Sequence, residues 1–241
     1  MIAAAQPVIP NFGGGGANSC VRRNGAFCWD WVSSHWDSTL RPALVQHIEL
    51  SLIAVGIGFV LALLTALVAY RFRHADTPLT LLYALLYTVP ALALFQLLVP
   101  LFGLSRTTAE VALVSYTLLI LFRNILTGLR EVPEEVRESA RAMGLNGRQV
   151  FWKVELPLAV PAIVAGLRIA IVTVIGLATI AVFVDNEGLG APIYEAIHAG
   201  PFNTELFAAA ALAFALALAA DGILVAAQRV LTPWARSRRA V

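Results

Sequence analysis

The sequence contains few charged residues. Asp, Glu, Lys and Arg make up 13% of its 241 residues and hydrophobic residues make up 59%, whereas about a quarter of the residues of a typical soluble domain are charged. This composition excludes an ordinary soluble domain. The net charge of +2 gives no indication of nucleic-acid binding. The sequence therefore predicts an all-α integral membrane protein with the lipid bilayer as its surroundings.

Motifs for catalysis are also missing. The chain has no Gly-x-x-x-x-Gly-Lys-Ser/Thr loop to surround nucleotide phosphates, no cluster of metal ligands and no paired nucleophile and base. We therefore expect that this chain is not an enzyme, and that it binds no metal or cofactor itself.

Only two cysteines occur, Cys20 and Cys28, and both lie in the first 47 residues. Trp29, Trp31 and Trp36 follow just before the first apolar run, as is typical of aromatic residues at a membrane interface. Residues 1–47 are therefore expected to form an extracytoplasmic segment. Its cysteines are either joined by a disulfide or present as two free thiols.

Five apolar stretches can supply the ~20 residues of a spanning helix. The third is short, and it spans only if Glu110 and Arg123 lie at the two membrane interfaces. A five-span domain over residues 48–230, followed by a basic cytoplasmic tail at 231–241, is the resulting prediction. The expected spans are about 48–70, 79–102, 107–125, 158–184 and 206–229.

The distribution of Lys and Arg predicts the orientation. If the charged loop after the third span is cytoplasmic, twelve of the 17 Lys and Arg residues lie inside, four lie outside, and Arg168 lies within a span. Because five spans are an odd number, the amino terminus is expected outside and the carboxyl terminus in the cytoplasm.

That charged loop runs from Glu131 to Pro157. It predicts two short amphipathic helices lying flat on the membrane surface. Pro133 suits the first turn of the first helix, Gly144 suits a left-handed residue at its end, and Pro157 closes the second. An apolar stripe facing the bundle is expected from Val132, Val136, Ala140 and Met143, with Glu134, Glu135, Arg137, Glu138 and Arg141 on the remaining surface.

Part of this loop resembles a family signature. Glu138-Ser139-Ala140, then Gly144, then Val154-x-Leu156-Pro157 match the spacing of the "EAA" motif of permease subunits of binding-protein-dependent ABC importers, with Ser139 in place of the central Ala. The resemblance implies a MetI-like permease fold with a cytoplasmic two-helix coupling loop at 131–157 between spans three and four. The implied ATPase-coupling residues are Glu138, Ser139, Ala140, Arg141, Ala142, Met143, Gly144, Leu156 and Pro157.

Further stretches resemble the osmoprotectant branch of these permeases, which import glycine betaine, choline and carnitine. They are Tyr87–Phe95, Phe122–Leu129 and Gly188–Gly190, although Asp185-Asn186-Glu187 is more acidic than the stretch usual in that branch. The resemblance implies a bacterial cytoplasmic (inner) membrane location and three partners. These are a cytoplasmic ABC ATPase dimer that holds ATP and Mg, a second permease subunit, identical or paralogous, and an extracytoplasmic substrate-binding protein.

Three other functions remain open. The chain could be an importer permease for another small solute such as an amino acid, a secondary transporter, or a membrane anchor that transports nothing. The odd number of spans and the lack of an internal repeat weigh against a secondary transporter.

Two charged residues lie within predicted spans, Arg168 and Asp221. Counted from the cytoplasmic side, both are ~12–15 Å deep at the helical rise per residue. One hypothesis is a buried ion pair that holds the last two spans together. The alternative is that each snorkels separately or lines a watery cavity.

Overall fold

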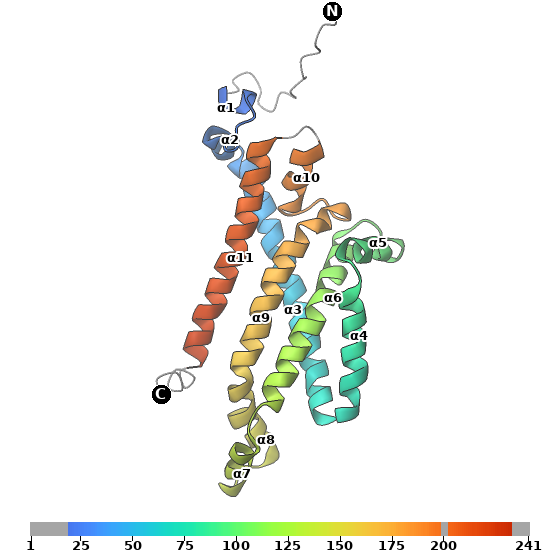
Figure 1. The fold of residues 1–241 in the computed structure, drawn as a ribbon, viewed down its shortest axis with the longest axis vertical. Coiled ribbons are helices and arrows are strands. Elements are labelled where there is room, and N and C mark those ends of the chain that lie inside the picture. Colours follow the sequence, from blue (N-terminus) through green and yellow to red (C-terminus); the bar gives the residue numbers. More distant parts are fainter. Residues whose placement is uncertain (1–18, 199–201, 233–241) are drawn as a thin grey trace, which may run out of the picture.

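The computed structural model describes residues 19–198 and 202–232 as a tall bundle of helices (Figure 1). No strand occurs in these residues. In chain order the elements are α1 Ser19–Arg22, α2 Trp29–Ser34, the π-turn η1 Trp36–Leu40, α3 Arg41–Arg71, the 3-10 turn η2 Arg73–Ala75, α4 Asp76–Thr88, α5 Ala91–Phe102, α6 Arg106–Arg130, α7 Glu134–Ala142, α8 Gly147–Val150, the π-turn η3 Phe151–Glu155, α9 Leu156–Ala178, the 3-10 turn η4 Ile180–Phe183, α10 Gly190–His198 and α11 Asn203–Leu231.

Four helical segments of this bundle are long and apolar enough to cross a membrane. A fifth span is present if α4 and α5, which meet at a bend of 100°, are counted as one. The predicted all-α architecture with five spans is confirmed on that count. The four continuous segments are Trp36–Arg71, Arg106–Arg130, Gly147–Ala178 and Asn203–Leu231.

The second predicted span, at 79–102, is broken at Pro90, one of the two prolines expected to kink it. The chain is extended at Val89 and Pro90, with ψ angles of 128° and 136°, and the helix restarts at Ala91 in a new direction. The Tyr116 hydroxyl on α6 donates a hydrogen bond to the Val89 carbonyl, which the break leaves without a helical partner. A polar group on a neighbouring helix thus stabilises the bend.

The fourth predicted span, at 158–184, differs at both ends. It begins earlier, because α8, η3 and α9 run on as one helical segment from Gly147. Pro157 does not close a separate second helix; it is the second residue of α9, directly after the π-helical turn η3, inside this continuous segment. The α-helix stops at Ala178, and the connection from α9 to α11 holds α10, a helix that the sequence pattern did not predict.

The core of the bundle lies where α3, α6 and α9 pack against one another. A β-carbon on Gly58 of α3 would come within 1.8 Å of Thr117 Oγ1 on α6, so the two helices approach as closely as glycine allows. One cluster of buried side chains includes Phe95 and Leu113, and a second, toward α7, includes Phe122.

Residues 19–40, here called the outer cap, pack on the beginning of α11 at the opposite end from α7 (Figure 1). Cys20 and Cys28 are joined by a disulfide and are not free thiols. The Cys28 N–H donates to Thr204 Oγ1 at 3.1 Å, and the Trp31 ring meets Phe202 edge to face. Most of the predicted tail at 231–241, and residues 1–18 of the predicted outer segment, lie outside the described residues.

Candidate functional site

Helix α7 is the centre of the candidate site, and local chemistry defines both of its ends. Pro133 is its N-cap, and Val132 just before it is buried. At the other end, Gly144 has a φ of +86°, as the sequence predicts for a left-handed residue. The Gly144 N–H donates to the Arg141 carbonyl at 2.9 Å and the Leu145 N–H to the Ala140 carbonyl at 3.2 Å, which is the Schellman arrangement.

The segment after α7 also begins with a cap. Asn146 accepts a hydrogen bond from the Gln149 N–H at 3.0 Å, and the Gln149 side chain accepts one from the Asn146 N–H at 2.9 Å. This capping box starts α8 within three residues of Gly144. The turn between the two helices is therefore short and well defined.

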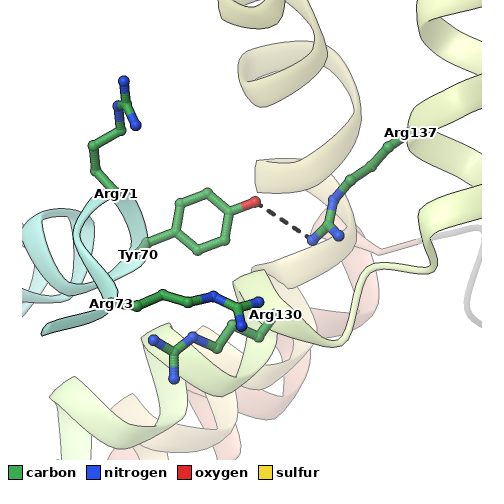
Figure 2. A pocket seen from close by; sticks show the side chains of 5 residues that line it. All are labelled: Tyr70, Arg71, Arg73, Arg130 and Arg137. Atoms are coloured by element: carbon green, nitrogen blue, oxygen red, sulfur yellow. Dashed lines mark hydrogen bonds between the residues drawn. The ribbon is translucent and has the colours of Figure 1, made fainter. Parts of the chain in front are cut away.

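Arg137 holds α7 to the bundle. Its Nε donates to Glu155 Oε1 at 2.9 Å, and its two terminal nitrogens donate to Glu134 at 2.9 Å and to the Leu129 carbonyl at 3.0 Å. A longer bond of 3.4 Å reaches the Tyr70 hydroxyl (Figure 2). The hydrogen bond from Arg137 lowers the pKa of Glu134, which keeps that carboxylate ionised.

The sequence analysis placed Arg137 on the exposed surface, and this was wrong. Only 14% of its side chain is exposed, and only 8% of that of Glu155. The importance of Glu155 was missed altogether. The sequence did contain a signal for this role. Glu155 lies directly before Leu156-Pro157, at the start of a long apolar run, and a carboxylate in that position needs a partner.

The face of α7 that points away from the bundle is exposed to solvent. Ala140 is buried and Val136 is half-buried, as the apolar stripe predicts, but Met143 is 74% exposed and does not continue the stripe. The structure brings together, on this exposed face and the turn after it, the predicted residues Glu138, Ser139, Arg141, Ala142, Met143 and Gly144. Leu156 and Pro157 lie apart from them, half-buried in the first turn of α9.

Two exposed carboxylates of α7, those of Glu135 and Glu138, form no ion pair with any described residue. Glu134, by contrast, accepts bonds from Arg137 and Arg141. An unpaired carboxylate beside small side chains and an exposed Met is a surface on which another protein can lie. Among the described residues, no group of three or more His, Cys, Asp or Glu could hold a metal ion.

Arg168 and Asp221 face each other across α9 and α11. Nε and one terminal nitrogen of Arg168 donate to the two carboxylate oxygens of Asp221, at 2.7 and 2.9 Å. About a third of each side chain is exposed, and both line a groove of about 610 Å³ together with Phe214. The two charges form an ion pair, as one hypothesis requires, but the pair is partly exposed to a groove lined mostly by apolar side chains.

A buried histidine, which the sequence analysis did not single out, orders the outer connection. His47 Nδ1 accepts from the Leu189 N–H at 3.2 Å, so Nε2 carries the proton and donates to the Ile175 carbonyl at 3.0 Å. Gln46 accepts from the Gly188 N–H at 3.1 Å. The Gly188–Gly190 turn is thus fixed to α3 and α9.

Comparison with known proteins agrees with this architecture. Residues 55–236 match the family described as "Binding-protein-dependent transport system inner membrane component". The chain belongs to that family. It is therefore a multi-pass membrane permease subunit, and in such systems a separate ATPase hydrolyses ATP. The outer cap lies outside the matched residues.

Several curated permeases are similar over most of the chain. The "Choline transport system permease protein OpuBB" of Bacillus subtilis is 34% identical over 189 residues, which are 78% of this chain and 86% of that protein. The "Osmoprotectant import permease protein OsmW" of Salmonella typhimurium is 34% identical over 193 residues, with 78% and 89% covered. The "Glycine betaine/carnitine/choline transport system permease protein OpuCB" of B. subtilis is 32% identical over 189 residues, with 78% and 86% covered.

The fold of this permease matches a solved one. A chain of the inward-facing MetNI methionine ABC transporter superposes with a TM-score of 0.71 at 21% identity, covering 83% of this chain and 98% of that one. The MetI-like permease fold implied by the signature is therefore confirmed.

Proposed function

We propose that this chain is the permease subunit of an ATP-driven importer for osmoprotectants that carry a quaternary ammonium group, such as glycine betaine, choline or carnitine. The observation that carries the proposal is the similarity at 32–34% identity, over 78% of the chain, to permeases named for those solutes. The chain contributes the solute pathway, while ATP and Mg bind to the partner ATPase.

The exposed face of α7 is the proposed contact with a cytoplasmic ABC ATPase dimer. Its unpaired Glu138, its exposed Met143 and the left-handed Gly144 are offered outward, while Arg137 ties the other face to α3, α6 and Glu155. Movement of the ATPase would thus be passed to the spanning helices through a rigid connection.

The orientation follows from the same proposal. With α7 in the cytoplasm, the excess of Lys and Arg lies inside, in agreement with the positive-inside rule. The outer cap and α10 then face the extracytoplasmic side, where a substrate-binding protein docks. A second permease subunit, identical or paralogous, completes the pathway.

Ergothioneine is a second candidate solute. A stretch of 131 residues is 40% identical to the "Ergothioneine transport permease/ergothioneine binding protein EgtU" of Helicobacter pylori, covering 54% of this chain and 23% of that protein. Ergothioneine, like glycine betaine and choline, carries a trimethylammonium group. Both proposals therefore concern one chemical class of solute.

Uptake in cells that lack this chain tests the proposal. The cells are supplied with the wild-type chain or with no chain, and uptake of labelled glycine betaine, choline, carnitine and ergothioneine is measured at high osmolarity. We expect the wild-type chain to restore uptake of at least one of the four, and depletion of ATP to abolish it. A chain that inserts into the membrane yet restores none of the four would refute the solute class.

A further inference from the structure

A cavity surrounded by arginines lies beside α7 at the end of the bundle (Figure 2). Its volume is about 330 Å³, near the lower limit for small-ligand sites. The side chains come from the end of α3, from η2, from the end of α6 and from α7. They are Tyr70, Arg71, Arg73, Arg130 and Arg137.

Two of the four guanidinium groups are balanced by carboxylates. Arg137 pairs with Glu155 and Glu134. Arg130 pairs with Asp76 and also donates to a backbone carbonyl of α3. These two arginines have structural tasks that explain their presence without a ligand.

The other two have none of these partners. Arg71 lies over the ring of Phe72, with its guanidinium carbon 5.6 Å from the ring centroid. No carboxylate of the described residues forms an ion pair with Arg71 or Arg73. The cavity therefore has an excess of positive charge.

Helix dipoles account for part of this arrangement. Arg71 and Arg130 end α3 and α6, where a cation stabilises the exposed carbonyls. Arg73 lies beyond the end of α3, in η2, and Figure 2 shows its side chain reaching toward Arg130. Arg71 points away from these two side chains in Figure 2, so the guanidinium groups that lie close together are those of Arg73 and Arg130. Like charges this close repel each other unless an anion lies between them.

We propose that this cavity binds a phosphate group, presented by the headgroup of an anionic membrane lipid such as phosphatidylglycerol. Planar guanidinium groups bind phosphate oxygens in pairs. Basic pockets between spanning helices are suited to such headgroups. Free phosphate would form the same hydrogen bonds with the arginines. It has no acyl chains, however, to contact the apolar surface around the cavity.

The position of the cavity favours the lipid as the source. Tyr70 and Arg71 end a long apolar helix, at the level where a spanning segment leaves the hydrocarbon core. Exposed apolar side chains, Phe72 and Leu81 among them, lie on the neighbouring surface of η2 and α4, ready to contact acyl chains. Arg137 lines the cavity and also holds α7 against the bundle. A headgroup bound in the cavity would therefore contact the side chain that positions the candidate site. This inference does not depend on which solute is carried.

The test is lipid binding to the purified full-length chain, measured by native mass spectrometry with phosphatidylglycerol and with phosphatidylcholine. We expect a preference for phosphatidylglycerol, a loss of affinity of ~5-fold in Arg73→Gln, and a larger loss in the double variant Arg71→Gln/Arg73→Gln. Arg148→Gln is the matched control, because it removes the same charge from an exposed residue outside the cavity. Equal binding of the two lipids, or equal losses in Arg73→Gln and Arg148→Gln, would overturn the proposal.

Two further arms complete the experiment. Inorganic phosphate is added to the chain in phosphatidylcholine nanodiscs; if it binds at the cavity while phosphatidylglycerol is not preferred, the lipid source is wrong. Arg73→Lys keeps the positive charge but loses the planar guanidinium with its paired N–H donors. We expect this variant to retain more affinity for phosphatidylglycerol than Arg73→Gln. An unchanged thermal midpoint in each variant confirms that the fold is intact.

Discussion

The outer cap and α7 occupy opposite ends of the molecule and are held in different ways. The cap is closed by the Cys20–Cys28 disulfide and packs an apolar cluster, including Trp31 and Phe202, on α11. Helix α7 is held to the bundle by the hydrogen bonds of the Arg137 guanidinium, and its other face is exposed. Of the two, α7 falls within the residues that match the family, at 55–236, and the cap does not. We therefore predict that changes in α7 affect transport more than changes in the cap.

The largest effect is expected at the turn after α7. An Asp at position 144 would occupy a left-handed conformation, at a cost of about 1 kcal/mol. Apart from its chain neighbours, no atom of the described residues lies within 4 Å of a β-carbon there, so the added side chain would instead meet a protein bound to the exposed face. We expect Gly144→Asp to abolish solute uptake while insertion into the membrane stays normal.

Gly147→Asp is the matched control for that variant. Gly147 also has no atom within 4 Å of its β position, but its φ is not positive and it begins α8, where an acidic residue is tolerated. Uptake and membrane levels of both variants are measured side by side. Full uptake by Gly144→Asp would remove the coupling role from α7.

The next largest effect is expected from breaking the buried pair that holds α7. Arg137→Gln leaves the Glu155 carboxylate buried without its ion-pair partner, and removing one member of such a pair typically costs about 3–5 kcal/mol. The free energy of unfolding in detergent and limited proteolysis of residues 131–147 provide the measurement. The double variant Arg137→Gln/Glu155→Gln should recover much of the loss.

Arg141→Gln is the comparison for this pair, because Arg141 bonds to the same Glu134 from an exposed position. Exposed pairs contribute at most about 1 kcal/mol. If Arg137→Gln and Arg141→Gln destabilise equally, Arg137 does not hold α7 in the way proposed here.

A smaller and more local effect is expected in the cap. Replacing Cys20 and Cys28 by Ser releases a short loop, for which chain entropy predicts a loss of about 2–3 kcal/mol. Hydrogen exchange should become faster in residues 19–40 and stay unchanged in α7, with uptake retained. Loss of uptake in this variant would show that the cap takes part in transport.

The smallest effect is expected at the Arg168–Asp221 pair. Both side chains are about one-third exposed, so solvent weakens their attraction and we expect the pair to contribute little. A double-mutant cycle with Arg168→Ala and Asp221→Asn measures the coupling energy. Zero coupling together with normal assembly and transport would mean that the pair does not hold α9 and α11 together.

Apolar length and helix-end chemistry made much of the fold predictable. Runs of apolar residues located α3, α6 and α11, and a glycine following an amphipathic stretch gave the end of α7. Pro90 indicated a possible kink in the second span, because proline removes a helical hydrogen bond and disfavours helix at the residue before it. The size of the bend, 100°, was not predictable from the sequence. The hydroxyl that satisfies the freed Val89 carbonyl comes from Tyr116, 27 residues further along the chain.

The candidate site shows the same limit. Helical periodicity identified Glu134 and Glu138 as exposed and Ala140 as buried. It assigned Arg137 to the surface, because spacing within one helix does not show that Glu155 lies beneath it. Contacts between residues distant in sequence decided which of the charges are exposed and which are buried.

Cross-linking tests most directly the claim that α7 contacts the ATPase. The two cysteines of the chain form a disulfide, so one added cysteine is the single free thiol. Met143→Cys lies on the exposed face, and Asn186→Cys is exposed at the opposite end of the bundle. The account predicts that a short bifunctional reagent joins the ATPase to Met143→Cys and not to Asn186→Cys in membranes that contain both subunits. Cross-linking from Asn186→Cys alone, or from neither, would contradict it.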